Sequence, residues 1–422
     1  MPGLEPLTVV ICVDHASVTG GQAKVAIESA IGLKKSGARP ILFAAVGPPD
    51  PRLAEAGVEV VCLGQHDLLA NPSRAAAAWR GLWNSQAASA LKALLARLPR
   101  ERTLVHVHGW AKALSPSIVA PLRAAGVPAI YTIHEYFLFC PNGGFYNYQR
   151  GAVCALRPLS LRCLATHCDS RIYAHKLWRF GRLYATRRWL RMAEAFSDYV
   201  CISDHQRQIV GSQLPAGARL HRLSDPIDAE DLGPKAEPAS GDLIFVGRLS
   251  PEKGVALFAE AAARVGVVPT LIGDGPQSDE LKRRFPEARF LGWLPPEEAR
   301  ARMRAARALI FPSLWYETQG LTAFEAQAMG TPVIVSDVCA AREAVEDGVS
   351  GLWFKSASVE ALAAVLTKIR DDALVARLSR AAYETYWRAP ATLEAHVAGL
   401  RSIYAEALGR KRADGAPAVS RA

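Results

Sequence analysis

The feature that most constrains the fold is a repeated alternation of short apolar runs with longer segments of helical period. The first five runs are rich in Val, Ile and Leu and have the length of strands, at 7–13, 38–45, 58–63, 104–108 and 129–134. Helical segments separate most of them, at 22–35, 73–98 and 115–125. Nearly continuous apolar strands joined by helices are typical of a parallel sheet covered on both faces. The alternation predicts a doubly wound α/β domain.

The same alternation restarts in the second half of the chain. A strand at 199–203 is followed by another helix and strand, and then by a stretch rich in Pro, Gly, Ala and acidic residues. Further strands are predicted at 243–246, 270–272, 289–291, 308–311 and 333–336, followed by helices from 359 to 408. We therefore predict an N-terminal domain (1–223), a linker (224–242), a second Rossmann-like domain (243–390), a C-terminal helix (391–408) and a disordered basic tail (409–422).

Composition and charge narrow the class of protein. The formal net charge of +10 favours phosphates, acidic glycans or an anionic membrane surface as partners. The first apolar run lacks a basic flank and a cleavage site, so we interpret it as a strand and not as a signal peptide. No apolar stretch reaches the length of about 18 residues that a spanning helix needs. We expect a cytoplasmic protein that can bind the inner face of the membrane peripherally.

Two glutamates follow the strand at 308–311. Glu317 and Glu325 are separated by seven residues, and Gly320 lies three residues after the first. A helix that begins near Gly320 would direct its free N–H groups and its positive end at a phosphate. Carboxylates are repelled by a diphosphate, so their partners should be the vicinal hydroxyls of a sugar and of a ribose.

Two cations follow the strand at 243–246. Arg248 and Lys253 lie five residues apart in Phe-Val-Gly-Arg-Leu-Ser-Pro-Glu-Lys-Gly, around the expected start of a helix. Arg can bind diphosphate oxygens in a bidentate manner, and Lys adds a compact positive charge.

Taken together, these motifs resemble those of the retaining glycosyltransferases of family 4, the group 1 type found in bacterial polysaccharide biosynthesis. The resemblance covers nearly the whole chain and is densest over 243–354. It implies the GT-B fold, in which two Rossmann-like domains face each other across a cleft. It also implies transfer of a hexose from a nucleoside diphosphate sugar to a glycan or lipid-linked acceptor, with no metal or other cofactor required.

The resemblance assigns roles residue by residue. Glu317 is expected to contact the donor sugar and Glu325 the ribose, while Arg248 and Lys253 stabilise the leaving diphosphate. Donor binding is further expected at the helix start, Gly320, Leu321 and Thr322, and at the backbone of Trp293 and Leu294 beside the base. The last pair could equally belong to an ordinary turn.

In the first domain, the loop after the first strand and the end of the fifth strand carry the candidates. Gly20 and Gly21 permit close backbone approach to the donor phosphates, although a plain tight turn explains them too. They do not form a Gly-x-Gly-x-x-Gly fingerprint, which argues against a dinucleotide cofactor. His134 matches the histidine that orients the transferred sugar in the family, whereas we interpret His106 and His108 as structural.

Two further segments allow two interpretations each. Cys140, Cys154, Cys163 and Cys168 could bind zinc tetrahedrally, but they lack a Cys-x2-Cys pair and buried thiols are common. The stretch 171–191 interleaves Arg and Lys with aromatic residues, which suits an anionic membrane surface or a lipid diphosphate acceptor. An ordinary helix with one face in the core explains that pattern equally well.

Other functions remain as alternatives. A nucleotide-sugar epimerase or a sugar phosphorylase would share the architecture, and the net charge of +10 would also fit a nucleic-acid-binding protein. No nucleic-acid-binding motif accompanies that charge, so no nucleic-acid partner is expected. An inactive sugar-binding scaffold is disfavoured by the intact set of candidate residues. The donor base, the sugar and the acceptor are left open.

Overall fold

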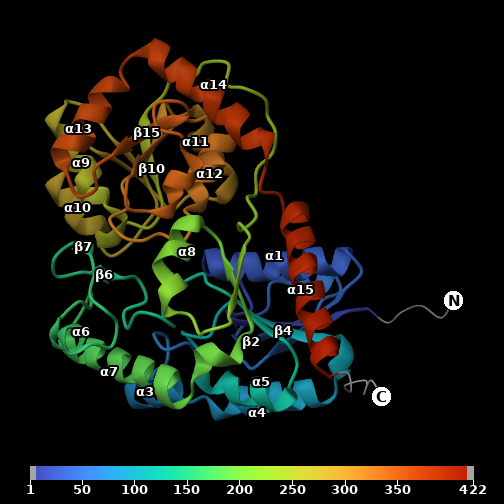
Figure 1. Ribbon diagram of the computed structural model, residues 1–422. Helices are drawn as coiled ribbons and strands as arrows, with labels where there is room; N and C mark the ends of the chain where they lie inside the picture. The colour runs from blue at the N-terminus through green and yellow to red at the C-terminus, as the bar shows by residue number, and fades with distance from the viewer. Residues whose placement is uncertain (1–5, 416–422) are drawn as a thin grey trace.

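The structure, a computed structural model, describes residues 6–415 and contains two parallel sheets (Figure 1). Within these residues the first sheet has seven strands in the order β3-β2-β1-β4-β5-β8-β9. They are β1 (Thr8–His15), β2 (Arg39–Val46), β3 (Glu59–Cys62), β4 (Thr103–Val107), β5 (Ala129–Thr132), β8 (Asp198–Cys201) and β9 (Arg219–Arg222).

The second sheet, in the same described range, has six strands in the order β12-β11-β10-β13-β14-β15. They are β10 (Leu243–Val246), β11 (Thr270–Ile272), β12 (Arg289–Gly292), β13 (Ala308–Phe311), β14 (Val333–Ser336) and β15 (Gly351–Phe354). The prediction of two doubly wound α/β sheets is thus confirmed. The strand β15 was not predicted, because a four-residue run after glycine gives little periodicity to read.

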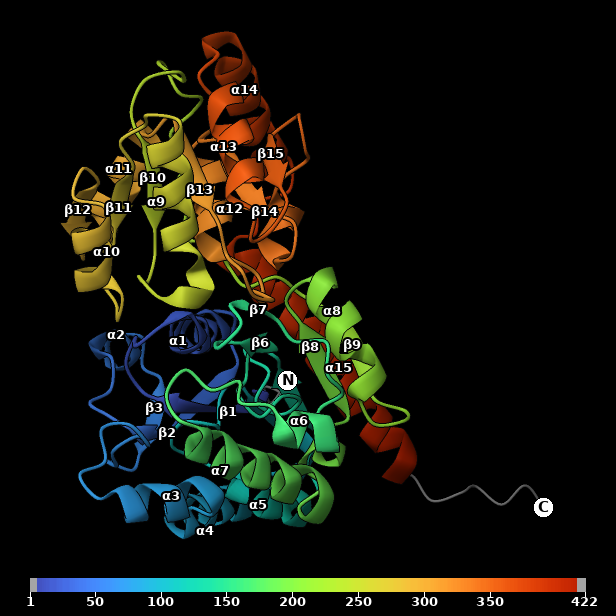
Figure 2. The ribbon, with the colours of Figure 1, turned by 90° about the vertical axis from the view of Figure 1, so that its left-hand side faces the viewer.

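Helices cover both faces of each sheet (Figures 1 and 2). Those of the first half are α1 (Gly21–Lys35), α2 (Pro51–Glu55), α3 (Arg74–Leu82), α4 (Ser85–Ala96), α5 (Val119–Ala125), α6 (Leu161–Ala165), α7 (Tyr173–Tyr184) and α8 (Asp204–Val210). Those of the second half are α9 (Val255–Arg264), α10 (Ser278–Arg284), α11 (Pro296–Ala305), α12 (Leu321–Ala328), α13 (Val359–Lys368) and α14 (Asp372–Arg388).

The apolar runs form strands because both faces of the sheet are buried. Along β1, Val10 and Cys12 point into one core cluster, while Val9, Ile11 and Val13 point into the cluster on the opposite face. All five side chains are fully buried. A strand with two buried faces has no polar side, so its sequence reads as a continuous apolar run and not as an alternation.

The strand order reverses between β1 and β4 in the first sheet and between β10 and β13 in the second. In open α/β sheets, ligands bind at the carboxyl ends of the strands at such a reversal. Figure 2 shows that α1 and the small hairpin β6 (Tyr146–Asn147) and β7 (Ala152–Val153) lie at the edge of the first half that faces the second. The residues that follow β1, β4, β5, β10 and β13 are therefore the candidates for ligand binding.

The C-terminal helix returns to the first half of the molecule. After α14 the chain crosses back, and α15 (Leu393–Gly415) lies against α1 (Figure 1). At Gly32 of α1, an added Cβ would lie 2.6 Å from Cγ2 of Val397, so the glycine permits this close approach. Tyr404 of α15 is fully buried in the same core.

Two features differ from the prediction. The helix α15 continues to Gly415, where a disordered tail from 409 onward was predicted; Arg410 is anchored there by an ion pair with Asp198 of β8, 2.6 Å away. The rest of that tail, 416–422, lies outside the described residues. The single helix predicted over 73–98 is divided into α3 and α4, because extended Trp83 ends the first and the side chain of Asn84 caps the second.

Candidate functional site

Two helix N-termini from opposite halves of the molecule meet in the cleft. The helix α12 begins at Leu321, as predicted, and Gly320 before it has a φ of 87°. An added Cβ on Gly320 would lie 2.6 Å from Cβ of Ala341, so only glycine fits this turn. At Gly21, where α1 begins, an added Cβ would lie 3.5 Å from Cδ1 of Leu321. The positive ends of both helices therefore lie where an anion could bind them together.

The loop before α12 brings a carboxylate and an ammonium group into contact. Nζ of Lys253 donates a hydrogen bond to Oε1 of Glu317, and the Ser313 hydroxyl donates to the same oxygen at 3.0 Å. Glu317 is only 6% exposed. Lys253 also lies 5.7 Å from the ring centre of Trp315. Two of the predicted residues, Lys253 and Glu317, thus contact each other. Arg248, on the loop after β10, is exposed.

The second predicted glutamate lies one turn into α12. Burial raises the pKa of Glu325, and the positive charges of Lys24 and Arg300 act in the opposite direction. Lys24 belongs to α1 in the other half, and its Nζ lies 3.6 Å from a carboxylate oxygen of Asp228. Leu321, one turn before Glu325 in α12, lies against Gly21 at the start of α1, so this part of α12 adjoins α1.

His134 lies two residues after β5, at the carboxyl end of that strand. Its Nδ1 is 3.4 Å from Oδ2 of Asp225, and its Nε2 is 2.9 Å from Nδ1 of His108. The two imidazole rings are stacked with centres 5.1 Å apart. The hydroxyl of Thr318, in the loop after Glu317, donates to the backbone oxygen of His134 at 3.4 Å. The structure thus brings His134 next to the loop that carries Glu317.

Two partners of His134 were not predicted from the sequence. His108 was interpreted as a structural residue, yet it contacts His134 directly. Asp225 was assigned to a linker, yet its side chain is buried in the cleft. Burial lowers the pKa of His108 well below its usual value, so this ring is neutral. No local pattern around Asp225 distinguishes it from an ordinary linker residue.

The residue after His134 carries an unusual carboxyl group. Burial raises the pKa of Glu135 to about 7. The positive charge of Lys112 acts in the opposite direction, whereas the negative charge of Asp14 adds to the rise. The second cation near Glu135 is Arg182, which is 7% exposed and lies between the rings of Trp110 and Trp178. Perturbed buried groups of this kind concentrate at functional sites.

The remaining predicted donor residues differ in exposure and backbone geometry. Gly20 has an extended backbone, with a φ of 161°, and an added Cβ would meet no atom within 4 Å, so neither strain nor crowding requires glycine there. Thr322 is half-buried in the first turn of α12. Trp293, just after β12, is 72% exposed, while Leu294 packs against the core of the second half.

The cysteines of the segment 140–168 do not gather into one cluster in the described part of the chain. All eight cysteines are free, and among the described residues no group of three or more His, Cys, Asp or Glu could hold a metal ion. Within the described residues, Cys140, Cys154, Cys163 and Cys168 therefore do not come together as such a group. Burial raises the pKa of Cys140 to about 12, which keeps its thiol protonated.

The same segment instead covers the loop that carries Glu317. An added Cβ on Gly144 would lie 2.9 Å from the Trp315 ring, and the rings of Phe145 and Tyr316 have centres 6.4 Å apart. The segment therefore forms one wall of the cleft, a placement that its sequence did not reveal.

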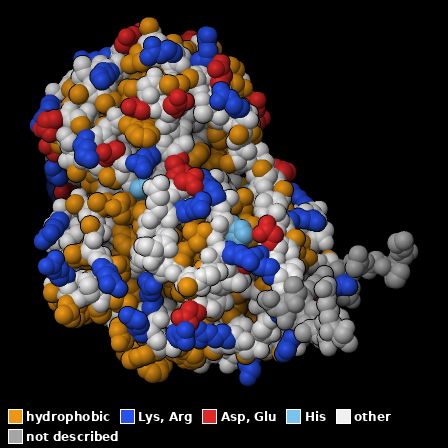
Figure 3. Space-filling view, in the orientation of Figure 1, with side chains coloured by type: hydrophobic (Ala, Val, Ile, Leu, Met, Phe, Trp, Pro, Cys, Tyr) orange, Lys and Arg blue, Asp and Glu red, His pale blue; other side chains and the backbone are white. Residues whose placement is uncertain are grey.

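The basic stretch 171–191 is less exposed than its composition indicates. It forms α7 and one π-helical turn, Ala185–Trp189. Lys176 and Arg182 are buried, and Arg179 pairs with Asp169 at 2.9 Å. On the face of the molecule shown in Figure 3, Lys and Arg side chains are scattered over both halves. No helix in the described part of the chain is both long enough and apolar enough to span a membrane.

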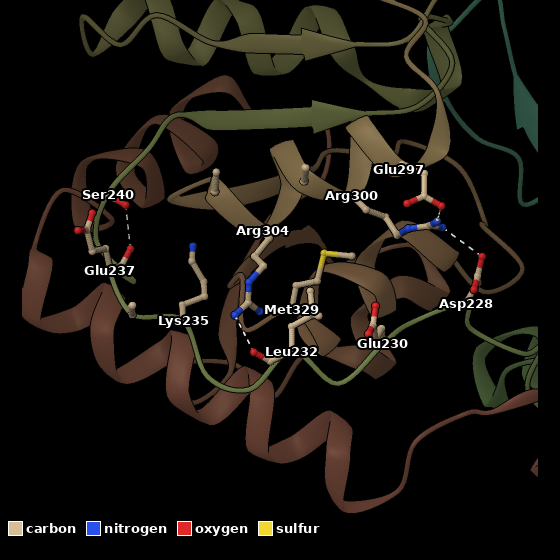
Figure 4. Close-up of a pocket in the computed structure, with 13 residues that line it drawn as sticks. Asp228, Glu230, Leu232, Lys235, Glu237, Ser240, Glu297, Arg300, Arg304 and Met329 are labelled. Atoms are coloured by element: carbon tan, nitrogen blue, oxygen red, sulfur yellow. Dashed lines mark hydrogen bonds and ion pairs between the residues drawn. The ribbon is translucent and has the colours of Figure 1, made fainter.

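A cavity of about 790 Å³ separates the linker from α11 (Figure 4). Arg300 extends from α11 to Asp228 of the linker, 3.1 Å away, and Arg304 donates to the backbone oxygen of Leu232 at 3.0 Å. Burial lowers the pKa of Lys235 in this cavity to about 8. Because Asp228, which lines the cavity, also lies 3.6 Å from Nζ of Lys24 in α1, the cavity adjoins the first half of the molecule.

Comparison with known proteins follows the two halves of the chain. Residues 19–231 match the model described as Glycosyltransferase Family 4, and residues 240–372 match the one described as Glycosyl transferases group 1. Glycogen synthase of Mycobacterium tuberculosis is 33% identical over 249 residues, which are 53% of this chain and 59% of that relative. The chain thus aligns with about three-fifths of that relative's length.

Solved structures agree over nearly the whole chain. Sucrose-phosphate synthase from Thermosynechococcus elongatus superposes with a TM-score of 0.71 and 20% identity, covering 96% of this chain and 99% of that one. The Anabaena protein HepE in complex with UDP superposes with a TM-score of 0.64 and 17% identity, covering 94% and 100%. At these identities the likeness establishes the fold, which is GT-B.

Proposed function

We propose that this chain, which belongs to glycosyltransferase family 4, transfers a hexose from a nucleoside diphosphate sugar to a hydroxyl group of a glycan or lipid-linked acceptor, with retention of anomeric configuration. The observation that carries the proposal is the meeting of the α1 and α12 N-termini, at Gly21 and Leu321, beside the contact between Lys253 and Glu317. A diphosphate is the anion that two helix N-termini and a lysine together suit best. HepE, which shares the fold, was solved with UDP.

Each charged side chain near the two helix N-termini has a role in the proposed function. The diphosphate would lie between the two helix N-termini, where Lys253 and Arg248 neutralise its charge and make a metal unnecessary. In the structure, Lys253 contacts Glu317. With the donor bound, the same ammonium group would contact both this carboxylate and the phosphate. Glu317 would then accept hydrogen bonds from sugar hydroxyls, and Glu325, next to α1, from the ribose diol.

The transfer step moves charge onto the leaving group. The bond between the anomeric carbon and the diphosphate oxygen breaks, and the acceptor oxygen bonds to the same face of the sugar. The acceptor's proton passes to the departing diphosphate oxygen. Positive groups aimed at the diphosphate stabilise the transition state more than the ground state, which is how they raise the rate.

Nucleotide binding can be tested first by thermal shift. UDP, GDP, ADP and their sugars are added to the parent, to Glu325→Ala and to Glu298→Ala, a control at an exposed glutamate of α11. We expect one nucleotide series to raise the melting temperature of the parent and of the control, because a ligand that binds only the folded state stabilises it. The shift should be lost in Glu325→Ala. Absence of a shift with every nucleotide would refute the donor site.

The role of the two cations is tested by turnover. Arg248→Ala and Lys253→Ala should each lower the turnover rate at least about tenfold, which corresponds to about 1.4 kcal/mol of transition-state stabilisation. Lys282→Ala, an exposed lysine of α10, serves as the control and should leave turnover unchanged. Activity of both cleft variants within about twofold of the parent would contradict the assignment.

The basic helix supports a role in cell-surface polysaccharide synthesis at a membrane. Although Lys176 and Arg182 are buried, Tyr184 is 42% exposed and Trp189 is 75% exposed, and Arg188 beside them is also exposed. Exposed aromatic and basic side chains together bind anionic membrane surfaces.

Vesicle binding tests this surface. Phosphatidylglycerol vesicles should retain the parent and Arg283→Glu, a control on α10, but should retain Arg188→Glu with Trp189→Ala much more weakly. Phosphatidylcholine vesicles should retain none of them, since they lack the negative charge. Equal retention of the double variant and the parent would exclude this surface as the membrane contact.

A further inference from the structure

A second cavity lies in the first half of the molecule, away from the meeting point of the two helix N-termini. Its volume is about 1100 Å³. Residues 154–161, which lead into α6, line it together with residues from 187–194 and 209–215, which follow α7 and end α8 (labelled in Figure 2). Sites that bind organic ligands have volumes of about 300–1,000 Å³, so this cavity can hold a large one.

The charged lining of this cavity is mainly basic. Its described lining residues include four arginines, Arg157, Arg187, Arg188 and Arg191, and one acid, Glu194. Arg191 is paired with Glu194. Among the described side chains, neither Arg157 nor Arg188 has a partner in an ion pair or a side-chain hydrogen bond. The lining thus carries more positive charge than its own residues neutralise, which favours an anionic ligand.

Arg187 is half-buried at this cavity without a carboxylate partner in the described part of the chain. Its Nη2 donates to the backbone oxygen of Gln213 at 2.9 Å, which is a neutral acceptor. Burial lowers the pKa of Arg187. Removing a guanidinium group from water costs free energy unless an anion compensates it. A phosphate group would supply that anion, and Arg can bind its oxygens in a bidentate manner.

Apolar side chains form much of the remaining lining. Leu156, Leu159, Ile209 and Leu214 are half-buried there, and Leu161, at the start of α6, is 84% exposed. A bare phosphate or a free sugar would leave these side chains in contact with water. A hydrocarbon chain would cover them, and burial of apolar surface is favourable. The lining therefore suits an amphiphile with an anionic headgroup and an apolar chain.

The backbone around this cavity is strained. Three of its lining residues have a left-handed φ: Phe145 at 48°, Leu159 at 60° and Arg191 at 48°. Such angles are uncommon for residues other than glycine. Only five non-glycine residues in the described chain have them, so their concentration here is notable. Strained backbone of this kind clusters at ligand sites, in agreement with a binding role.

Two lining residues connect this cavity with the proposed donor site. The rings of Phe145 and Tyr316 have centres 6.4 Å apart, and both residues line the cavity. Tyr316 directly precedes Glu317, the residue assigned to the donor sugar. A ligand that reaches Tyr316 therefore lies beside the loop that carries Glu317.

We propose that this cavity binds the acceptor substrate and that the acceptor is a sugar joined through a diphosphate to a hydrocarbon chain. The arginines hold the diphosphate, the leucines cover the first part of the chain, and the sugar extends toward Tyr316. The inference rests on the proposed function and narrows its acceptor to the lipid-linked class. Trp189, 75% exposed and next to Arg188, lies where the rest of the chain would enter the membrane.

Binding to the full-length protein tests the headgroup and the chain separately. Geranyl diphosphate carries both, inorganic diphosphate only the anion, and geraniol only the chain. In calorimetric titration, geranyl diphosphate should bind at least about tenfold more tightly than either part, because each part contacts only some of the lining. Equal affinities for geranyl diphosphate and inorganic diphosphate would contradict the apolar part of the site.

Matched pairs of exposed arginines test the basic lining. Arg157→Gln with Arg188→Gln removes two cations of the cavity, whereas Arg162→Gln with Arg283→Gln removes two exposed arginines that do not line it. The first variant should bind geranyl diphosphate at least about tenfold more weakly than the parent, since charge-assisted hydrogen bonds are lost. The second should bind it like the parent. Leu161→Ser should weaken binding of geranyl diphosphate but not of inorganic diphosphate.

Lys253→Ala separates this site from the donor site. Lys253 is assigned to the donor diphosphate and does not line the cavity, so this variant should bind geranyl diphosphate like the parent. If Lys253→Ala loses the ligand while the Arg157 and Arg188 double variant keeps it, the lipid diphosphate occupies the donor site and the inference is wrong. A parent that binds no geranyl diphosphate also overturns it.

The nucleotide provides the last comparison. The nucleotide selected by thermal shift should bind together with geranyl diphosphate, because transfer requires donor and acceptor in one complex. Mutual displacement of the two would refute the acceptor role. If the parent binds no nucleotide, the proposed function fails, while the variants above still decide whether the cavity binds a lipid diphosphate.

Discussion

The buried carboxyl group of Glu135 makes the stability of the first half depend on pH in a predictable direction. In the unfolded chain this group loses its proton near the usual pKa of 4.5, whereas in the folded protein burial raises the pKa to about 7. Between these values the unfolded state releases the proton and the folded state keeps it. Stability therefore falls as the pH rises from 4.5 to 7 and stays lower above that range.

The magnitude follows from the two pKa values. A difference of about 2.5 between them lowers the unfolding free energy by about 3 kcal/mol, a loss that is complete above pH 7 and absent below pH 4.5. Glutamine is neutral at every pH, so Glu135→Gln removes this penalty. Between pH 4.5 and pH 8, the unfolding free energy of the variant should rise by up to about 3 kcal/mol relative to that of the parent.

Urea unfolding followed by tryptophan fluorescence measures this difference. The parent, Glu135→Gln and Glu55→Gln, a control at an exposed glutamate of α2, are compared at pH 4.5 and pH 8. The intrinsic effect of the amide is the same at both pH values, so it cancels in the change between them. The prediction is wrong if the unfolding free energies of Glu135→Gln and the parent differ by the same amount at both pH values. It is also wrong if the parent is the more stable protein at pH 8.

Three further substitutions test the packing around the cleft. Tyr404→Phe removes the 2.7 Å hydrogen bond to His106 and should lower the unfolding free energy by about 1–2 kcal/mol in chemical denaturation. Gly320→Ala places a Cβ 2.6 Å from that of Ala341 at a φ of 87°, so it should weaken nucleotide binding in calorimetry by more than about tenfold. Asn84→Ala removes a buried helix cap and two side-chain hydrogen bonds and should lower the melting temperature, with about 2–3 kcal/mol lost.

Much of the fold could be predicted because its signals are local. Strands buried on both faces need apolar side chains at every position, which is why the run at β1 was identified. The turn before α12 needs a positive φ, and Gly320 supplies it. The break between α3 and α4 was missed because Asn84 caps a helix through contacts with distant segments as well as with its own.

The candidate site was predictable only in part, for the same reason. Motif spacing selected Glu317 and Lys253, which contact each other, but it gave no indication of Asp225 or His108 as partners of His134. These residues lie on separate segments, and no spacing along the chain encodes their meeting.

The sequence by itself determined the two α/β sheets, the turns at their carboxyl ends and the residue types that could bind a nucleoside diphosphate sugar. Only the tertiary structure decided which of these residues meet, that Lys176 and Arg182 face inward, and that a linker aspartate completes the cleft. Secondary structure depends on periodicities of a few residues, which can be read from the sequence alone. Burial and pKa depend on neighbours that lie far apart along the chain, and only the packing of the tertiary structure brings them together.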